Sequence, residues 1–230
     1  MSNETKTAIV TGAAGALGFA CVRQLLEQGF QVAAVGRSME HLRARFDRDD
    51  ARLFLVAADV TDLSNCQDVA DQVLRRSGRI DALCNIAGGF GMGSPLALDA
   101  VQQYELLMAL NAGAVFRMVH CVAPSMVEAG SGSIVNVGAR SALSGLAGMA
   151  AYGASKSAVI RMTESFAAEF GRSGVRVNCV LPGIIDTPQN RRDMPDADFS
   201  QWVAPQEIAQ VIGFLVSGQS AAANGASVAV

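Results

Sequence analysis

The chain has little that would suit it to nucleic acid, a metal or a membrane. Its 230 residues carry 18 Lys and Arg against 21 Asp and Glu, without a basic stripe, so neither nucleic acid nor anionic lipid is an expected partner. The two histidines, His41 and His120, are too isolated to form a metal site. No apolar run reaches the roughly 18 residues of a membrane span. The first residues lack the basic and apolar parts of a secretory signal, so we expect none.

Paired cysteines are also missing. None of the five lies in a CxxC motif, which argues against both a disulfide framework and a zinc site. We expect reduced thiols and a cytoplasmic location. The five are Cys21, Cys66, Cys84, Cys121 and Cys179.

What the chain does have is apolar residues, at 50% against 17% charged, which is typical of a globular protein. Its length fits one domain, 1–230. Short apolar segments alternate with longer amphipathic ones, which predicts an α/β fold: a doubly wound, Rossmann-like parallel sheet of about seven strands with helices on both faces. Strands are expected at 7–10, 31–35, 132–137 and 225–230 and within 51–60, 80–89 and 175–183. Helices are expected at 17–28, 39–46, 63–77, 104–128, 152–171 and 205–216.

Two details of this pattern carry further expectations. Pro124 is expected to disturb the last turn of the 104–128 helix, because proline lacks the N–H group that a helix needs. The stretch 182–202 is the longest irregular segment, and a connection of that length is more often functional than idle.

A glycine-rich turn, TGAAGALG at 11–18, directly follows the first strand and opens the first helix. Glycine permits positive φ and close approach of a ligand to backbone N–H groups, and the helix N-terminus favours a phosphate. This position predicts a dinucleotide pyrophosphate site rather than a simple strand-to-helix turn. Its expected contacts are Gly12, Ala14, Gly15, Ala16, Leu17 and Gly18.

The tips of the next strands indicate which dinucleotide is bound. The second strand ends in Gly36, Arg37 and Ser38, where NAD-selective sheets usually carry a carboxylate. A guanidinium and a hydroxyl suit a 2′-phosphate, so we expect NADP, with NAD possible. The alternative is that Arg37 is a solvated surface residue.

Two further strand ends complete the expected cofactor cleft. Asp59 could accept the adenine amino group beside the Val60 N–H, or it could simply cap a turn. Asn85, Ala87 and Gly88 end the fourth strand, and the small residues there would let a ribose or a ring lie against the backbone.

The chain resembles the short-chain dehydrogenase/reductase family along essentially its whole length. It departs from the family pattern at Ala16, where a third glycine is usual, and at Ala139, where the catalytic serine is usual. It also has NIAG for NNAG and lacks the usual C-terminal DGG. The motifs that carry the resemblance, in the family's order and spacing, are TGAAGALG, Asp59-Val60, Asn85 to Gly88, Asn111, Tyr152 to Lys156 and Pro182-Gly183 with Thr187.

One branch of the family, the dihydropteridine reductases, is similar to this chain over the final third. It shares the missing serine and the short C-terminus, and segments such as GMAAYGASK and 182–202 look alike. That branch prefers NADH and has an aspartate at the tip of the second strand, where this chain has Gly36-Arg37. The resemblance therefore implies a shared site geometry more firmly than a shared substrate.

Tyr152 and Lys156 lie at i and i+4, on one face of a predicted helix. A free phenol has a pKa of about 10, and we expect the neighbouring ammonium to lower it. By resemblance, Tyr152 is the catalytic acid/base, Lys156 tunes it and holds the nicotinamide ribose, and Asn111 anchors a water that relays protons. The alternative is an amphipathic surface pair.

Three interpretations of Ala139 compete. Another hydroxyl, Ser141 or Ser144, could replace the serine. The substrate could be already activated, as an iminium, quinonoid or conjugated ring is, and so need less help than the roughly 3 kcal/mol that an oxyanion donor supplies. Finally, the chain could be a dinucleotide-sensing protein without catalytic turnover.

The resemblance also implies where the substrate and the nicotinamide lie. The 182–202 segment would be a lid, with Pro182, Gly183, Ile185 and Thr187 against the nicotinamide. The lid residues could instead be a solvated loop with Trp202 packed as a hinge, and Phe90 or Met92 could be ordinary core. Candidate substrate contacts are Phe90, Met92, Ala139, Arg140, Met194 and Trp202, with Arg191, Arg192 and Phe199 nearby.

Together these observations predict an NADP-preferring reductase of a small carbonyl, imine or quinonoid compound. The alternatives are dihydropteridine reductase, 3-oxoacyl or ketone reductase, and a non-catalytic dinucleotide sensor. The resemblance implies a homodimer or homotetramer formed through the helices at 104–128 and 152–171. The expected partner is a small-molecule substrate.

Overall fold

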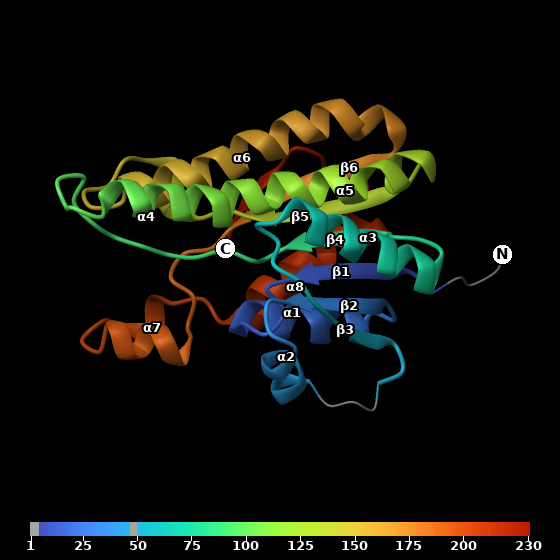
Figure 1. Cartoon of the computed structure of the whole chain (residues 1–230), viewed down its shortest axis with the longest axis horizontal. Coiled ribbons are helices and arrows are strands. Elements are labelled where there is room, and N and C mark those ends of the chain that lie inside the picture. Colours follow the sequence, from blue (N-terminus) through green and yellow to red (C-terminus); the bar gives the residue numbers. More distant parts are fainter. Residues whose placement is uncertain (1–4, 47–49) are drawn as a thin grey trace.

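Seven strands, all paired in parallel, form a single sheet in the computed structural model, which describes residues 5–46 and 50–230. Their order is β3-β2-β1-β4-β5-β6-β7 (Figure 1). The predicted doubly wound sheet is thus confirmed. The strands are β1 (Thr7–Thr11), β2 (Gln31–Gly36), β3 (Leu53–Ala57), β4 (Ala82–Asn85), β5 (Gly132–Val137), β6 (Val175–Leu181) and β7 (Ser227–Ala229).

Helices cover both faces of this sheet, and each face has its own apolar core. Successive residues of a strand point to opposite faces, so Ile9 of β1 packs in one core while Ala8 and Val10 pack in the other. One core is formed with α3 (Leu63–Ser77), α5 (Ala114–Glu128) and α6 (Ala150–Phe170). The other is formed with α1 (Ala16–Glu27), α2 (Met39–Arg45) and α8 (Pro205–Val216).

The strand order reverses between β1 and β4, which run side by side although two strands separate them in the sequence. The chain leaves these two strands toward opposite faces, which opens a crevice at their carboxyl ends. The Thr11 hydroxyl lies at this point and accepts hydrogen bonds from the N–H groups of Ile86 (3.0 Å) and Ala87 (3.1 Å). The two turns that flank the crevice are therefore tied together.

The predicted 104–128 helix is longer and less regular than expected. It begins with α4 (Ala100–Leu107), widens into a π-helix at Met108–Gly113 and continues as α5. The expectation that Pro124 would disturb its last turn is wrong, because α5 runs on to Glu128. Pro124 and His120 are both exposed, so water can bond the His120 carbonyl that proline leaves without a donor.

The same helical stretch bears on the membrane question. Contrary to the sequence expectation, 100–128 is long and apolar enough to cross a membrane, but 56% of its apolar window is buried inside the protein. That is the behaviour of a core helix.

The 182–202 segment is more ordered than the sequence suggested. It contains α7 (Pro188–Asp193) and a 3-10 turn at Phe199–Gln201. Thr187 caps α7 by accepting from the Asn190 N–H (3.1 Å), and Pro188 occupies the first helical position, where its missing N–H costs nothing. A bridge between Ile185 and Val203 closes the base of the segment.

Candidate functional site

The first turn needs glycine at two positions for steric reasons. Gly12 has φ 66°, and a Cβ there would stand 2.9 Å from the backbone N and Cα of Ala87. A Cβ at Gly18 would stand 2.2 Å from the Gly12 carbonyl oxygen. Both positions exclude any side chain, so the turn, α1 and the end of β4 can pack closely.

This turn leaves backbone donors free. Gly15 caps α1 without a side chain, and its own N–H bonds to the Gly12 carbonyl (3.1 Å). Among the described residues, the N–H groups of Ala14, Ala16, Leu17 and Gly18 have no acceptor. Together with the positive end of the α1 dipole, they form an anion site at the crevice.

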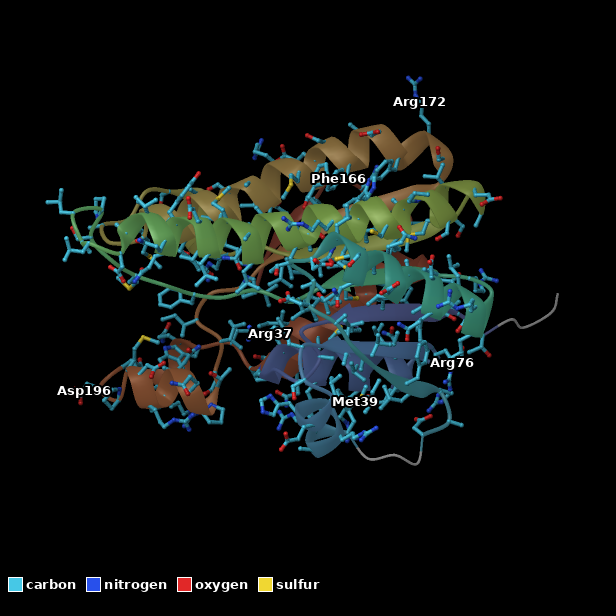
Figure 2. The ribbon with its side chains drawn as sticks, in the orientation of Figure 1. Arg37, Met39, Arg76, Phe166, Arg172 and Asp196 are labelled. Carbon is cyan, nitrogen blue, oxygen red and sulfur yellow. The ribbon has the colours of Figure 1, made fainter. Side chains whose placement is uncertain are left out.

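The tips of β2 and β3 place Arg37 beside Asp59. Asp59 accepts from the N–H (2.9 Å) and hydroxyl (2.7 Å) of Thr61; these bonds lower its pKa, and the nearby Arg37 guanidinium contributes to the lowering. Asp59 therefore stabilises a turn, as the alternative interpretation proposed. Both bonds go to its Oδ1 atom, and its other carboxylate oxygen can still accept a hydrogen bond. The Arg37 guanidinium is exposed at the carboxyl edge of the sheet (Figure 2).

Ser38 also has a structural role, since its hydroxyl accepts from the His41 N–H (3.2 Å) and caps α2. A hydroxyl that accepts one bond can still donate its own hydrogen. Val60 follows Asp59 and is buried. The four residues that we predicted to bind cofactor here thus follow the ends of two adjacent strands, β2 and β3.

Asn85 does not face the crevice. Its amide donates to Asn136 (2.9 Å), whose own amide donates to the Thr163 hydroxyl (2.9 Å) of α6. All three side chains are buried, so this chain of hydrogen bonds joins β4, β5 and α6 beneath the site. Asn136 and Thr163 were missed at the sequence level, although an asparagine within an apolar strand is a signal for such a partner.

Asn111 lies in the π-helix and is fully buried. Its amide donates to the Gly89 carbonyl (3.0 Å) and the Ser155 hydroxyl (2.9 Å), and its oxygen accepts from the Gly89 N–H (2.8 Å). Ser155 in turn donates to the carbonyl of Tyr152 (2.8 Å). The side-chain donors of Asn111 are thus both used, and a proton relay would have to use its backbone. Ser155 is a third buried residue that the sequence motifs did not point to.

Lys156 is buried at the centre of this arrangement. It is 6% exposed, and its ammonium donates to the Val137 carbonyl at the end of β5 (2.8 Å). A Cβ at Gly88 would stand 2.8 Å from Asn111 Oδ1 and 3.2 Å from Lys156 Nζ, so these three residues meet at one point. Burial lowers the pKa of Lys156 to about 8.

Tyr152 lies one turn before Lys156 and packs edge-on against Phe90, with ring centroids 5.0 Å apart. Phe90 is 64% exposed, so it covers the tyrosine from the solvent side. The expected lowering of the Tyr152 pKa by the ammonium is wrong for this structure. Burial raises the pKa of Tyr152 instead, and the lysine directs its charge to the Val137 carbonyl.

Ala139 is buried directly after β5, where it begins the 3-10 turn Arg140–Leu143. Ser141 and Ser144 line a groove together with Gly153, Ala154 and Ser157. Those three α6 residues project from a different side of the helix than Tyr152 and Lys156 do, because each residue turns the helix by about 100°. No hydrogen bond joins either serine to Tyr152 within the described part of the chain.

The lid segment is braced by its own side chains. Arg191 forms an ion pair with Asp186 (2.6 Å) and lies over the Phe199 ring (4.7 Å), which packs on Trp202 (4.7 Å). Trp202 thus has the packing role of the alternative interpretation. Arg192 bonds to Gln189 (2.8 Å), and Met194 follows α7 half-buried. On the other rim, Met92 is exposed and lies beside Gly148.

Residues 6–198 match the family model described as short chain dehydrogenase. The chain is 34% identical over 237 residues to a D-threitol dehydrogenase of Mycolicibacterium smegmatis, covering 98% of this chain and 91% of that protein. It is 31% identical to the 3-oxoacyl-[acyl-carrier-protein] reductase FabG of Thermotoga maritima, covering 98% and 96%. Among solved structures, levodione reductase superimposes with a TM-score of 0.89 at 28% identity, covering 98% of this chain and 95% of that chain.

The burial of Lys156 predicts a pH-dependent stability. Its pKa of about 8 in the folded protein lies below the value of about 10.4 for a free lysine. Between these values the unfolded chain binds more protons, so the free energy of unfolding of the wild type rises with pH. Lys156→Met removes this dependence. Unfolding in urea gives the free energy of unfolding of the wild type and of Lys156→Met. We expect the wild-type value minus the Lys156→Met value to increase by about 2 to 3 kcal/mol between about pH 7.5 and about pH 10.5.

Lys6→Met is the matched control, because Lys6 is exposed and its loss should leave the pH profile unchanged. Parallel profiles for the wild type and Lys156→Met would show that the ammonium is not buried in solution.

Proposed function

This chain belongs to the short-chain dehydrogenase family, and on that premise we propose that it is an NADP-preferring reductase of a small, activated carbonyl, imine or quinonoid compound. One observation carries the proposal: the buried Lys156, one helical turn after Tyr152, meets Asn111 at Gly88, and the neighbouring Ala87 packs on Gly12 of the turn with the free N–H groups. A proton donor and a dinucleotide cradle thus share one crevice.

The residues present fit a nicotinamide dinucleotide. The unbonded N–H groups at the start of α1 suit a pyrophosphate, and the bare backbone of Gly12 and Gly88 leaves room that a Cβ would fill. Arg37 and the Ser38 hydroxyl suit a 2′-phosphate. Pro182, Gly183, Ile185 and Thr187 would lie along the nicotinamide. The bound cofactor would supply the hydride, and two solved structures with this fold are described as ElxO with NADP bound and NAD+-bound xylitol dehydrogenase.

The protein's own part of the reaction is proton transfer. A phenol with a pKa of about 10 is protonated at neutral pH, which is the form that would donate a proton to the reduced oxygen or nitrogen. Lys156 lies one turn away, where its ammonium would hold the nicotinamide ribose.

The lack of a serine at position 139 supports an activated substrate. Ser141 and Ser144 line a groove on another side of α6, which favours this interpretation over a replacement hydroxyl. Dihydropteridine reduction stays one specific candidate of this class. The ketone reductases among the relatives support 3-oxoacyl or ketone reduction as the next candidate. A dinucleotide sensor without turnover is the rival of another class.

The proposed oligomeric state and cellular location also rest on membership of the short-chain dehydrogenase family. Phe116 of α5 is 53% exposed and contacts Phe166 of α6, which stacks on Phe170 (Figure 2). An apolar helix face of this kind supports a homodimer or homotetramer formed through α5 and α6. We propose a cytoplasmic enzyme whose 230 residues form one domain.

The first test is turnover. Purified protein with NADPH is offered quinonoid dihydropterin, a cyclic imine, a β-ketoester and a diketone, and absorbance at 340 nm is followed. We expect oxidation with at least one compound and a loss of at least about a hundredfold in Tyr152→Phe, because general acid catalysis contributes about that much. NADPH binding should persist in the variant. Tight binding without turnover across the panel would instead favour the sensor.

The second test concerns position 139. Ala139→Ser adds a donor for developing oxyanion charge, which can raise a rate by about tenfold to a hundredfold. We expect kcat/KM to rise for the β-ketoester and to stay within about threefold for the cyclic imine. An equal rise for both compounds would contradict the activated-substrate interpretation.

The third test concerns Arg37. Arg37→Asp should weaken NADPH binding by about a hundredfold, because it removes a charge-assisted pair and adds repulsion. NADH should lose little, since it has no 2′-phosphate. Fluorescence titration measures both. Arg172→Asp, at the far end of α6 in Figure 2, is the control. Equal losses for NADPH and NADH would rule out the 2′-phosphate contact.

A further inference from the structure

Arg140, the residue after Ala139, is held in place at the rim of the crevice. Its N–H donates to the Pro182 carbonyl (3.0 Å), which ties the turn to the end of β6. Two residues later, the Ala142 carbonyl accepts from the Ser157 hydroxyl of α6 (2.8 Å). The backbone of Arg140 is thus fixed between the lid's first residues and the helix that carries Tyr152.

The side chain of Arg140 runs along the start of the lid. Its Cδ and one guanidinium nitrogen both lie 3.8 Å from the point where a Gly183 Cβ would stand. The absence of a side chain at Gly183 leaves this path open. The guanidinium therefore lies beside the Pro182-Gly183 backbone, next to the proposed nicotinamide site. The Val230 carbonyl oxygen stands 3.9 Å from the same Cβ position and accepts from the Gly183 N–H (3.0 Å).

This guanidinium has no partner of its own. It makes no hydrogen bond or ion pair with any residue in the described ranges, and it is exposed. The nearby lid arginine differs, because Arg191 is held by Asp186 and Phe199. That pairing also removes Asp186 as a partner for Arg140. A fixed backbone with an unpaired cation is a site ready for an anion.

We propose that Arg140 is a specificity-determining residue and that the substrate is a small oxo or imino acid whose carboxylate it binds. This proposal rests on the proposed function. The hydride adds to the carbon of the C=O or C=N bond and Tyr152 gives the proton to its oxygen or nitrogen. The carboxylate forms and breaks no bond, and its contact with Arg140 orients the carbon.

The chemistry at position 139 agrees with this substrate class. Without a serine, the site lacks a neutral donor for the reacting oxygen, and a cation one residue away instead favours a substrate that already carries a negative charge. The protein is acidic overall, with a net charge of −3, so long-range attraction does not draw anions to it. A local cation is then needed to select them.

The experiment compares acids with their neutral analogues in the wild type, Arg140→Met and Arg140→Lys. The substrate pairs are pyruvate with methyl pyruvate, acetoacetate with methyl acetoacetate, and a cyclic imino acid with the parent cyclic imine, all with NADPH. We expect the wild type to prefer the acids and Arg140→Met to lose about 10- to 100-fold in kcat/KM for the acids only. Arg140→Lys should lose less, because it keeps the charge but not the paired donors. Arg172→Met is the control.

A second measurement does not require turnover. Oxamate and methyl oxamate, which are not reduced, are titrated into the NADPH complex while cofactor fluorescence is followed. Oxamate should bind the wild type about 10- to 100-fold more tightly than it binds Arg140→Met, and methyl oxamate should bind both alike. Equal binding of oxamate to both proteins would overturn the assignment, as would equal losses for acids and esters. Absence of turnover with every compound, with the oxamate preference intact, would refute the reductase but not the carboxylate site.

Discussion

The site depends on one buried hydrogen bond, from the Lys156 ammonium to the Val137 carbonyl at the end of β5 (2.8 Å). Burying an ammonium is costly, and the lowered pKa of Lys156 is a measure of that cost. The cost is tolerated because the surrounding elements are fixed independently of the lysine: the asparagine chain beneath it joins β4, β5 and α6. The ammonium is thus held away from water, beside the backbone of Gly88.

The π-helix at Met108–Gly113 is the second constraint. Such a wide turn is rare and is found most often at functional sites. Here it lets one side chain reach a loop and a helix: Asn111 bonds both backbone groups of Gly89 and the Ser155 hydroxyl of α6. A regular helix would rotate Asn111 away from one of these partners. The irregular helix therefore connects the β4 loop, which carries Phe90, to the helix that carries Tyr152.

Residues with a local role could be predicted from the sequence, and residues whose role depends on distant contacts could not. The need for glycine at Gly12 and Gly18 and the alternation of strands and helices follow from steric and periodic rules that act within a few residues. The direction of the Tyr152 pKa shift was mispredicted, because spacing along a helix shows that two side chains are neighbours but not which carbonyl the ammonium chooses. The helix at Pro188–Asp193 was missed although Thr187-Pro188 is a recognisable start, since it is too short to show an apolar period.

The turn after β5 brings together the departure at Ala139 and the exposed cation of Arg140. Ala139 removes a neutral hydrogen-bond donor, which would serve a reacting oxygen in any carbonyl substrate. Arg140 adds an unpaired cation, which serves only substrates with a negative group. A neutral donor and a cation act on different properties of a substrate. The donor stabilises the transition state of carbonyl reduction whatever the rest of the molecule is, and the cation selects molecules that carry a negative charge. Both changes affect the same few ångströms of the rim, because the Pro182 carbonyl holds Arg140 beside the lid. Under the proposed function, this crevice would select its substrate by charge more readily than it would activate an unreactive ketone.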